Sequence, residues 1–285
     1  MIYLEPAHLR YVEWLLPNLI QVILHFTSSY FWTLYLQNET KVQQEARMVK
    51  VCPAEKSGGV DIYAGFRQVN GNVMMELEFQ NIGCETPVSQ LAIQLNKNAF
   101  GLSPVNQQVV CNPPVSMGAH GKTSLQLVAN RSMLQPTAAG QSASPQIQIA
   151  IKNMATNQVF YFAAIFSLEA MCAADKQMDR SAFIDVWKNI DDGKELYSTI
   201  ADLPSTDIDE VQAKFEAYNI HFIARRAAME GQEVVYFFMK TLTGMDFLVE
   251  LTFKAGVNAC KICIKTESAP YGQLAKSAIE NLLRF

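Results

Sequence analysis

The chain has 285 residues, of which 49% are hydrophobic and 18% are charged. A chain of this length can bury more than one hydrophobic core, so we expect two domains and a remaining segment. The net charge is −4 and no long basic run occurs. A protein that holds nucleic acid through a basic surface is therefore set aside.

Residues 1 to 49 form a hydrophobic N-terminal extension of unknown role. Leu15 to Leu36 is long and apolar enough to cross a bilayer, but Pro17, Asn18 and other polar residues interrupt it. This stretch can be a membrane anchor, a hydrophobic helix that packs on the body, or an extension foreign to the fold behind it. A β-sandwich protein tethered through residues 15 to 36, with a structural second domain, is accordingly the alternative interpretation of the whole chain.

Residues 50 to 171 have the alternating pattern of half-buried strands. Asn70-Gly71 is a hairpin turn signal between two of them. The strand candidates are Val60 to Phe66, Val73 to Phe79, Gln90 to Leu95, Gln107 to Cys111, Thr123 to Val128, Gln146 to Lys152 and Gln158 to Phe166. Turn-rich stretches, Asn112-Pro113-Pro114 among them, separate these candidates. Short strands with no helix between them predict an immunoglobulin-like antiparallel β-sandwich.

Residues 172 to 285 mix both periods and form a second domain. A helix signal from Met178 to Asn189 can be capped by Asp179 or Ser181. The elements predicted after it are a strand at Glu195 to Ile200, a helix beginning near Ser205, four strands (His221 to Ala228, Glu233 to Leu242, Asp246 to Lys254 and Ala259 to Thr266) and a helix at Gln273 to Leu283. Glu230-Gly231 is one of the turns between the strands. This order predicts an α+β domain whose antiparallel sheet is covered by helices on one side.

No pattern in the sequence indicates catalysis, a metal or a cofactor. Cys260 and Cys263 have CxxC spacing, but residues three apart on a strand point to opposite faces and cannot share a metal ion. None of the four histidines has a neighbouring cysteine, serine or carboxylate arranged as a nucleophile or metal site. We therefore expect a non-enzymatic protein whose thiols are reduced.

Several stretches resemble the carboxy-terminal appendage of the beta subunit of a clathrin adaptor complex. They occur in the family's order and at nearly its spacing, and they are Ala92 to Gly101, Val159 to Phe162, Phe183 to Ile190, Ile223 to Arg226, Glu230 to Gln232 and Leu248 to Leu251. The resemblance implies a sandwich subdomain followed by a platform subdomain. It also implies a hub that docks short phenylalanine-containing motifs of endocytic or trafficking accessory proteins and helps to recruit clathrin.

The same resemblance implies a location and further partners. The protein would be cytoplasmic and peripheral on clathrin-coated vesicles, coated pits or trans-Golgi membranes, with membrane association mainly through the coat. Other adaptor subunits would be partners if a trunk is present. Residues 1 to about 48 do not resemble the family.

The residues that match the family's ligand sites are, on the platform, Trp187, Lys188, Glu195, Tyr236, Glu250 and Thr252, and, on the sandwich, Tyr161. Thr252 stands where the family has an arginine, so an acidic ligand residue is expected to gain little there. Trp187, at the end of its helix, either caps a core or offers a ledge to a partner. Glu250 and Thr252 should share one face of their strand, close to Tyr236 on the preceding strand.

Overall fold

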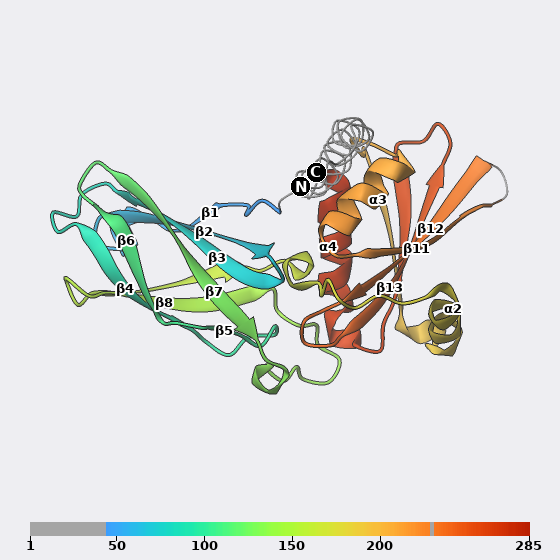
Figure 1. Cartoon of the computed structure of the whole chain (residues 1–285), viewed down its shortest axis with the longest axis horizontal. Helices are drawn as coiled ribbons and strands as arrows, with labels where there is room; N and C mark the ends of the chain where they lie inside the picture. Colours follow the sequence, from blue (N-terminus) through green and yellow to red (C-terminus); the bar gives the residue numbers. More distant parts are fainter. Residues whose placement is uncertain (1–43, 229–230) are drawn as a thin grey trace, which may run out of the picture. The chain divides into compact units, whose positions relative to one another are not determined.

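The computed structural model describes residues 44–228 and 231–285 (Figure 1). These residues form mainly antiparallel strands in three sheets. The hydrophobic stretch from residue 15 to residue 36 lies outside the described residues, as does Glu230 of the predicted Glu230-Gly231 turn. Among the helices of the described ranges, none combines the length and the apolar character needed to cross a membrane.

The sandwich predicted for the first domain is confirmed, and it is built from two sheets. One sheet has the order β1-β2-β3-β7-β5 and the other has the order β6-β4-β8-β9. The strands are β1 (Val49–Cys52), β2 (Val60–Val69), β3 (Asn72–Asn81), β4 (Val88–Leu95), β5 (Leu102–Pro104), β6 (Gln108–Val115), β7 (His120–Ala129), β8 (Gln146–Asn153) and β9 (Val159–Ile165).

Strict alternation along the strands places the core of the sandwich. On β3, Val73, Met75 and Leu77 are at most 1% exposed, whereas the residues between them reach the surface. The hairpin that joins β2 to β3 turns at Asn70 and Gly71, whose φ angles are 49° and 80°. Positive φ at both central residues matches the twist of the flanking strands, so the Asn-Gly pair sets the register of this hairpin.

The predicted turn at Asn112-Pro113-Pro114 is wrong, because these residues belong to β6. β6 is an edge strand of its sheet, where a proline removes no ladder hydrogen bond. Its register with β4 shifts between the pairs Val88↔Val115 and Gln90↔Val110, so the prolines lie in a bulge.

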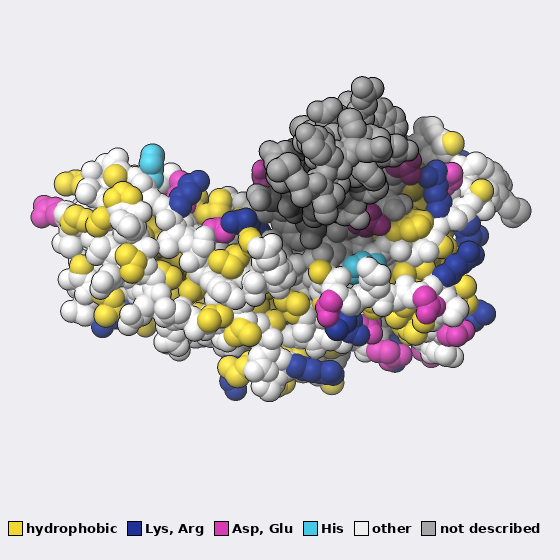
Figure 2. Space-filling model, in the orientation of Figure 1, with side chains coloured by type: hydrophobic (Ala, Val, Ile, Leu, Met, Phe, Trp, Pro, Cys, Tyr) yellow, Lys and Arg dark blue, Asp and Glu magenta, His cyan; other side chains and the backbone are white. Residues whose placement is uncertain are grey.

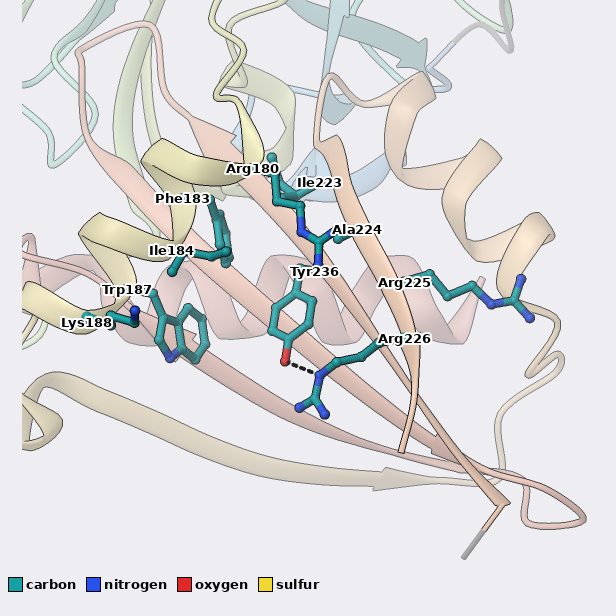
Figure 3. Close-up of a pocket in the computed structure, with 10 residues that line it drawn as sticks. All are labelled: Arg180, Phe183, Ile184, Trp187, Lys188, Ile223, Ala224, Arg225, Arg226 and Tyr236. Carbon is teal, nitrogen blue, oxygen red and sulfur yellow. Dashed lines mark hydrogen bonds between the residues drawn. The ribbon is translucent and has the colours of Figure 1, made fainter. Parts of the chain in front are cut away.

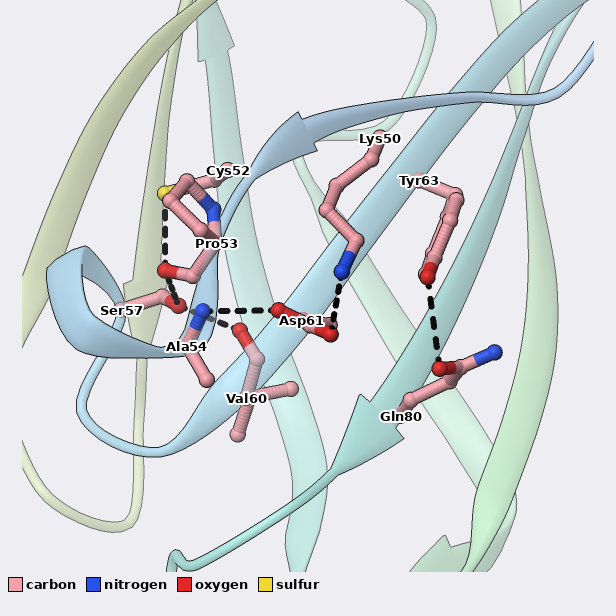
Figure 4. A network of polar contacts seen from close by, with 9 residues as sticks. All are labelled: Lys50, Cys52, Pro53, Ala54, Ser57, Val60, Asp61, Tyr63 and Gln80. Atoms are coloured by element: carbon pink, nitrogen blue, oxygen red, sulfur yellow. Dashed lines mark hydrogen bonds and ion pairs between the residues drawn. The ribbon is translucent and has the colours of Figure 1, made fainter.

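A polar network fastens β1 to the rest of its sheet (Figure 4). Asp61 accepts from Lys50 Nζ at 2.6 Å and from the backbone N–H of Ala54 at 2.8 Å. The hydrogen bond from Lys50, together with the bond from Ala54, lowers the pKa of Asp61 although burial opposes this shift. The strand pairing itself shifts register between Lys50 and Cys52, so these side-chain bonds stabilise an irregular edge.

The second domain contains one antiparallel sheet and three α-helices. Its sheet has the order β10-β14-β13-β12-β11. The elements are α2 (Arg180–Asn189), β10 (Glu195–Ala201), α3 (Ile208–Ala217), β11 (His221–Ala227), β12 (Gln232–Lys240), β13 (Asp246–Lys254), β14 (Ala259–Lys265) and α4 (Gly272–Arg284). Each predicted helix and strand of this domain is present, and the ends of β13 match the prediction.

The helices do not all cover one side of this sheet, so that expectation is wrong. Val235 and Phe237 of β12 belong to the large core that contains α3 and α4. Phe238, which points the other way, forms a separate buried cluster with Phe183 of α2. Each face of the sheet therefore has its own apolar layer, and α2 lies on the face opposite α3 and α4 (Figure 1).

Backbone and amide groups join the two domains. Gln44 accepts from the backbone N–H of Gln68 at 2.9 Å and donates to the carbonyl oxygen of Ala217 at 3.3 Å. Gln68 in turn donates to the carbonyl oxygen of Cys172 at 2.9 Å, and the side chain of Asn219 donates to the same oxygen at 3.3 Å. These bonds satisfy polar groups at the point where the sandwich ends and the platform begins.

Candidate functional site

A groove lies between α2 and β11 on the face of the platform sheet that α2 partly covers (Figure 3). Its volume is about 210 Å³. The residues that line it are Arg180, Phe183, Ile184, Trp187, Lys188, Ile223, Ala224, Arg225, Arg226 and Tyr236. Aromatic and aliphatic side chains form its floor and its α2 wall, while Lys and Arg side chains stand at its margins.

Helix α2 begins where the sequence predicts a cap. Asp179 accepts from the backbone N–H of Ala182 at 2.8 Å, which satisfies one of the free donors of the first turn. One helical turn apart on the inner side, Phe183 is buried and Trp187 is half-buried, and their rings stack at 5.6 Å with an angle of 24°. Phe183 thus supports the ring of Trp187, which lines the groove.

Tyr236 of β12 completes an aromatic cluster on the groove floor. Its ring meets that of Phe183 edge-on at 5.8 Å and that of Trp187 edge-on at 6.1 Å. Its hydroxyl accepts from Arg226 Nε at 3.0 Å. Burial raises the pKa of Tyr236, although the bond from Arg226 opposes this shift. Edge-to-face rings held by a hydrogen bond form a rigid surface, which a ligand can bind without ordering it first.

Lys265 of β14 fixes the end of α2 from below. Its side chain is 4% exposed and forms ion pairs with Glu195 at 2.5 Å and with Asp192 at 2.9 Å. It also donates to the carbonyl oxygens of Trp187 at 3.3 Å and Ile190 at 3.4 Å. Burial lowers the pKa of Lys265, but its bonds to both carboxylates outweigh burial and raise it. A cation at the carbonyl end of a helix is stabilising, so Lys265 holds the turn that carries Trp187.

The charged residues that line the groove are all basic. Arg225 points away from the groove (Figure 3) and pairs with Glu233 at 2.7 Å and Asp209 at 3.2 Å. Arg226 is held over the groove by its bond to Tyr236. The space-filling view shows Lys and Arg side chains, with Asp and Glu side chains between them, at this end of the platform (Figure 2). An acidic ligand therefore meets a favourable potential at the groove margin.

Of the six platform residues expected from the sequence, three line the groove and two lie on the strand beside it. Trp187, Lys188 and Tyr236 line the groove. Glu250 lies directly opposite Tyr236 in the register of β12 and β13, and Thr252 is the next residue on the same face. Glu195 differs, because its side chain is 10% exposed and paired with Lys265. It holds α2 in place and does not line the groove.

Tyr161, the residue expected to bind ligands on the sandwich, lies on β9, an edge strand of the second sheet. Its side chain is exposed, as are Val159 and Ile165 on the same face of the strand. Phe160 points inward and is buried. The tyrosine and its two aliphatic neighbours form an exposed apolar stripe that is separate from the platform groove.

Sequence reasoning missed the part that β11 plays in the groove. Ile223 and Arg226 were recognised only as part of a family pattern, whereas the structure places both at the groove. The register pairs Ala224 with Tyr236 and Arg226 with Val234. The available signal was Arg226, two residues after the small Ala224 on the same strand. This signal indicates a groove only once the pairing of β11 with β12 is known.

Comparisons with known proteins find similar sequences. Residues 173–283 match the family model described as the beta2-adaptin appendage, C-terminal sub-domain. The chain is 29% identical to AP-1 complex subunit beta-1 of Rattus norvegicus over 232 residues, which are 81% of this chain and 23% of that protein. It is 27% identical to AP-1 complex subunit beta of Dictyostelium discoideum over 229 residues, 80% of this chain and 23% of that protein. The chain thus spans about a quarter of the length of these relatives, and the resemblance found in the sequence is confirmed.

Proposed function

We propose, from the match of residues 173–283 to the family model described as the beta2-adaptin appendage, C-terminal sub-domain, that this chain is a protein-interaction module of a clathrin adaptor. In this proposal it docks short phenylalanine-containing motifs of accessory proteins, and it acts with clathrin during vesicle transport without catalysing a reaction. The observation that carries the proposal is the groove formed by Trp187, Phe183 and Tyr236.

The shape of the groove suits an amphipathic helix. One wall is a helix, α2, whose Ile184 and Trp187 are accessible, and the other is the edge strand β11. A ligand helix laid in this space would place residues one turn apart against the aromatic cluster, which is the pattern of helix-in-groove recognition. Phenylalanine side chains fit this cluster because offset and edge-to-face aromatic pairs are favourable.

The charges at the margin favour a ligand with acidic residues. Lys188 and Arg226 are exposed, and neither forms an ion pair with another described residue. Their attraction for a carboxylate is partly screened by salt, so it steers the ligand and sets its orientation more than it sets the affinity. Burial of the ligand's aromatic side chains supplies most of the binding free energy.

The exposed stripe at Tyr161 would act as a second docking site for a different class of motif. Two sites on one chain allow two weak contacts to act together, because the second contact forms at high effective concentration once the first is made. This behaviour suits a hub that gathers accessory proteins and clathrin on a coated membrane, where the protein would associate with the membrane through the coat.

The test is calorimetric titration of the 285-residue chain with a synthetic amphipathic peptide carrying two phenylalanines one helical turn apart. Trp187→Ala should weaken the binding free energy by about 2 kcal/mol or more, the usual effect of removing a central aromatic anchor. Tyr161→Ala is the matched control, since it also removes an accessible aromatic residue. Equal binding by wild type and Trp187→Ala would contradict the proposal.

A further inference from the structure

The face of the platform sheet that carries the groove continues beyond it as a strip, on which Tyr197, Thr199 and Lys261 are exposed while Val234 and Cys263 are buried. Directly paired residues on neighbouring strands form rungs across this face, and α2 covers the rung of Phe238, Leu248 and Lys265. The next two rungs are Ala224, Tyr236, Glu250, Cys263 and Tyr197, and then Arg226, Val234, Thr252, Lys261 and Thr199. Residues of one rung share a face because side chains alternate along each strand.

Lys261, on β14, is an exposed cation of the same rung as Arg226, which lies on β11. It is exposed, and no ion pair links it to any residue in the described parts of the chain. Both of its rung neighbours, Thr252 and Thr199, are neutral. Lys265, four residues along the same strand, differs because it is buried and paired with two carboxylates. Lys261 therefore has its charge available for a partner.

The positions of Arg226 and Lys261 set a distance across the strip. Three strand spacings separate β11 from β14 in the sheet order, which corresponds to about 14 Å. A helix rises 1.5 Å per residue, so this distance equals about ten residues of a ligand helix. A helix that crosses the strands beside α2 can then meet one cation near each of its ends.

Glu250 places a negative charge at the centre of the strip, between the positive charges of Arg226 and Lys261. It lies on β13 between Tyr236 and Cys263 and is half-buried. A carboxylate in the middle of the ligand helix would be repelled there, because like charges in a partly desolvated site are unfavourable. Carboxylates at the ends of the helix would avoid Glu250 and reach Arg226 and Lys261.

We propose that Lys261 is a specificity residue of the docking site, which selects an acidic residue about ten positions along the ligand helix from the one that meets Arg226. The inference rests on the proposed function, since it assumes that a helix occupies the groove. It names the partner more closely: an amphipathic helix of three turns or more with acidic residues at both ends and none at its centre. In this proposal the second acidic residue of the ligand binds Lys261 on β14, which lies opposite the neutral Thr252.

The experiment uses the 285-residue chain and four synthetic peptides built on the two-phenylalanine helix. One peptide has glutamine at both ends, two have glutamate at one end each, and the fourth has glutamate at both ends. The variants are Lys261→Thr, Arg226→Gln and, as a control that changes the net charge equally, Lys97→Thr on the exposed surface of the sandwich. Affinities are measured by calorimetry at low and at physiological salt.

We expect Lys261→Thr to weaken one single-end peptide and the double-end peptide by about two- to fivefold at low salt, the usual size of a partly exposed ion pair. Arg226→Gln should weaken the other single-end peptide. The neutral peptide should bind Lys261→Thr as it binds wild type, and Lys97→Thr should change nothing.

Two results would overturn the role of Lys261. It fails if Lys261→Thr leaves all four affinities unchanged, or if it weakens the neutral peptide as much as the acidic ones. Failure of the groove itself is distinguishable, since the neutral peptide would then bind wild type and Trp187→Ala alike or bind neither. That outcome would remove both proposals.

Discussion

The two candidate docking surfaces hold their aromatic residues in opposite ways. Tyr161 stands on an edge strand and is 78% exposed, and its neighbours on the same face of its own strand are aliphatic. Trp187 is half-buried, stacked on Phe183, and supported from below by Lys265. The first surface offers a protruding side chain, whereas the second offers a recess whose walls are already in place.

This difference has an energetic consequence. A ligand on Tyr161 must supply its own enclosure, so water remains near the contact. A ligand in the groove displaces water from a preformed aromatic surface and orders little of the protein. Central, well-enclosed aromatic residues carry the largest share of binding free energy in protein interfaces. We therefore expect the groove to tolerate substitution less than the stripe at Tyr161 does.

The largest expected effect concerns the support of the groove. Lys265→Met removes the cation and leaves Glu195, which is 10% exposed, without its oppositely charged partner. Breaking a buried ion pair on one side commonly costs about 3–5 kcal/mol of the free energy of unfolding. Chemical denaturation of the variant should show this loss, and the groove peptide should bind more weakly because Trp187 loses a backbone contact.

The double variant Glu195→Gln with Lys265→Met is its control. Replacing both partners leaves no unpaired buried charge, so much of the stability should return. If the single variant were as stable as wild type, the ion pair would not be what holds the end of α2, and the contrast between a supported and an unsupported aromatic residue would disappear.

The next effect tests whether the two regions are separable. Chains beginning at residue 44 and at residue 50 differ by residues 44–49, among them Gln44, which bonds to Gln68 on the sandwich and to Ala217 on the platform. The shorter chain leaves a buried backbone N–H at Gln68 unpaired, which costs about 1–3 kcal/mol. Equal denaturation midpoints for the two chains would mean that the domains need no such link.

A smaller effect is expected at Tyr161. Tyr161→Ala should weaken sandwich ligands by about 1 kcal/mol, the lower limit for an interface residue that matters, and should leave the groove peptide bound as before. Pull-downs from a lysate with wild type and this variant, read by mass spectrometry, would identify the ligands that depend on the stripe. A loss of groove-peptide binding in a folded Tyr161→Ala protein would instead indicate one shared site.

The smallest effect concerns Thr252. The sequence predicted that this residue weakens the preference for acidic ligands, and Thr252→Arg should strengthen that preference by about 0.5 kcal/mol in wild type. The gain should be larger when Thr252→Arg is made in Lys261→Thr. The two positions are directly opposite one another, so the new arginine then replaces the positive charge that Lys261→Thr removed. Titration with the glutamate and glutamine peptides measures both gains. If they were equal, Thr252 and Lys261 would not contact the same part of the ligand.

Much of this comparison could be predicted from the sequence, because local patterns determine it. The cap at Asp179 and the ends of β13 follow from residue types and alternation. The second apolar layer was missed although its signal is present: Val234 to Met239 is apolar without a break, which is typical of a strand buried on both faces. The β6 bulge and the Arg226 contact depend on which strand lies beside which, and no local pattern contains that information.

The two separate layers of the platform have a consequence for how its binding preference can be changed. Along β12 and β13, Tyr236 and Glu250 face the groove side, while their neighbours Val235 and Leu251 belong to the main core. Residues that face the ligand site and residues that form the core thus alternate along the same strands. A library that randomises only positions 197, 250, 252 and 261 should yield modules with new ligand preferences and nearly unchanged stability, so this sheet is a ready scaffold for engineered peptide readers.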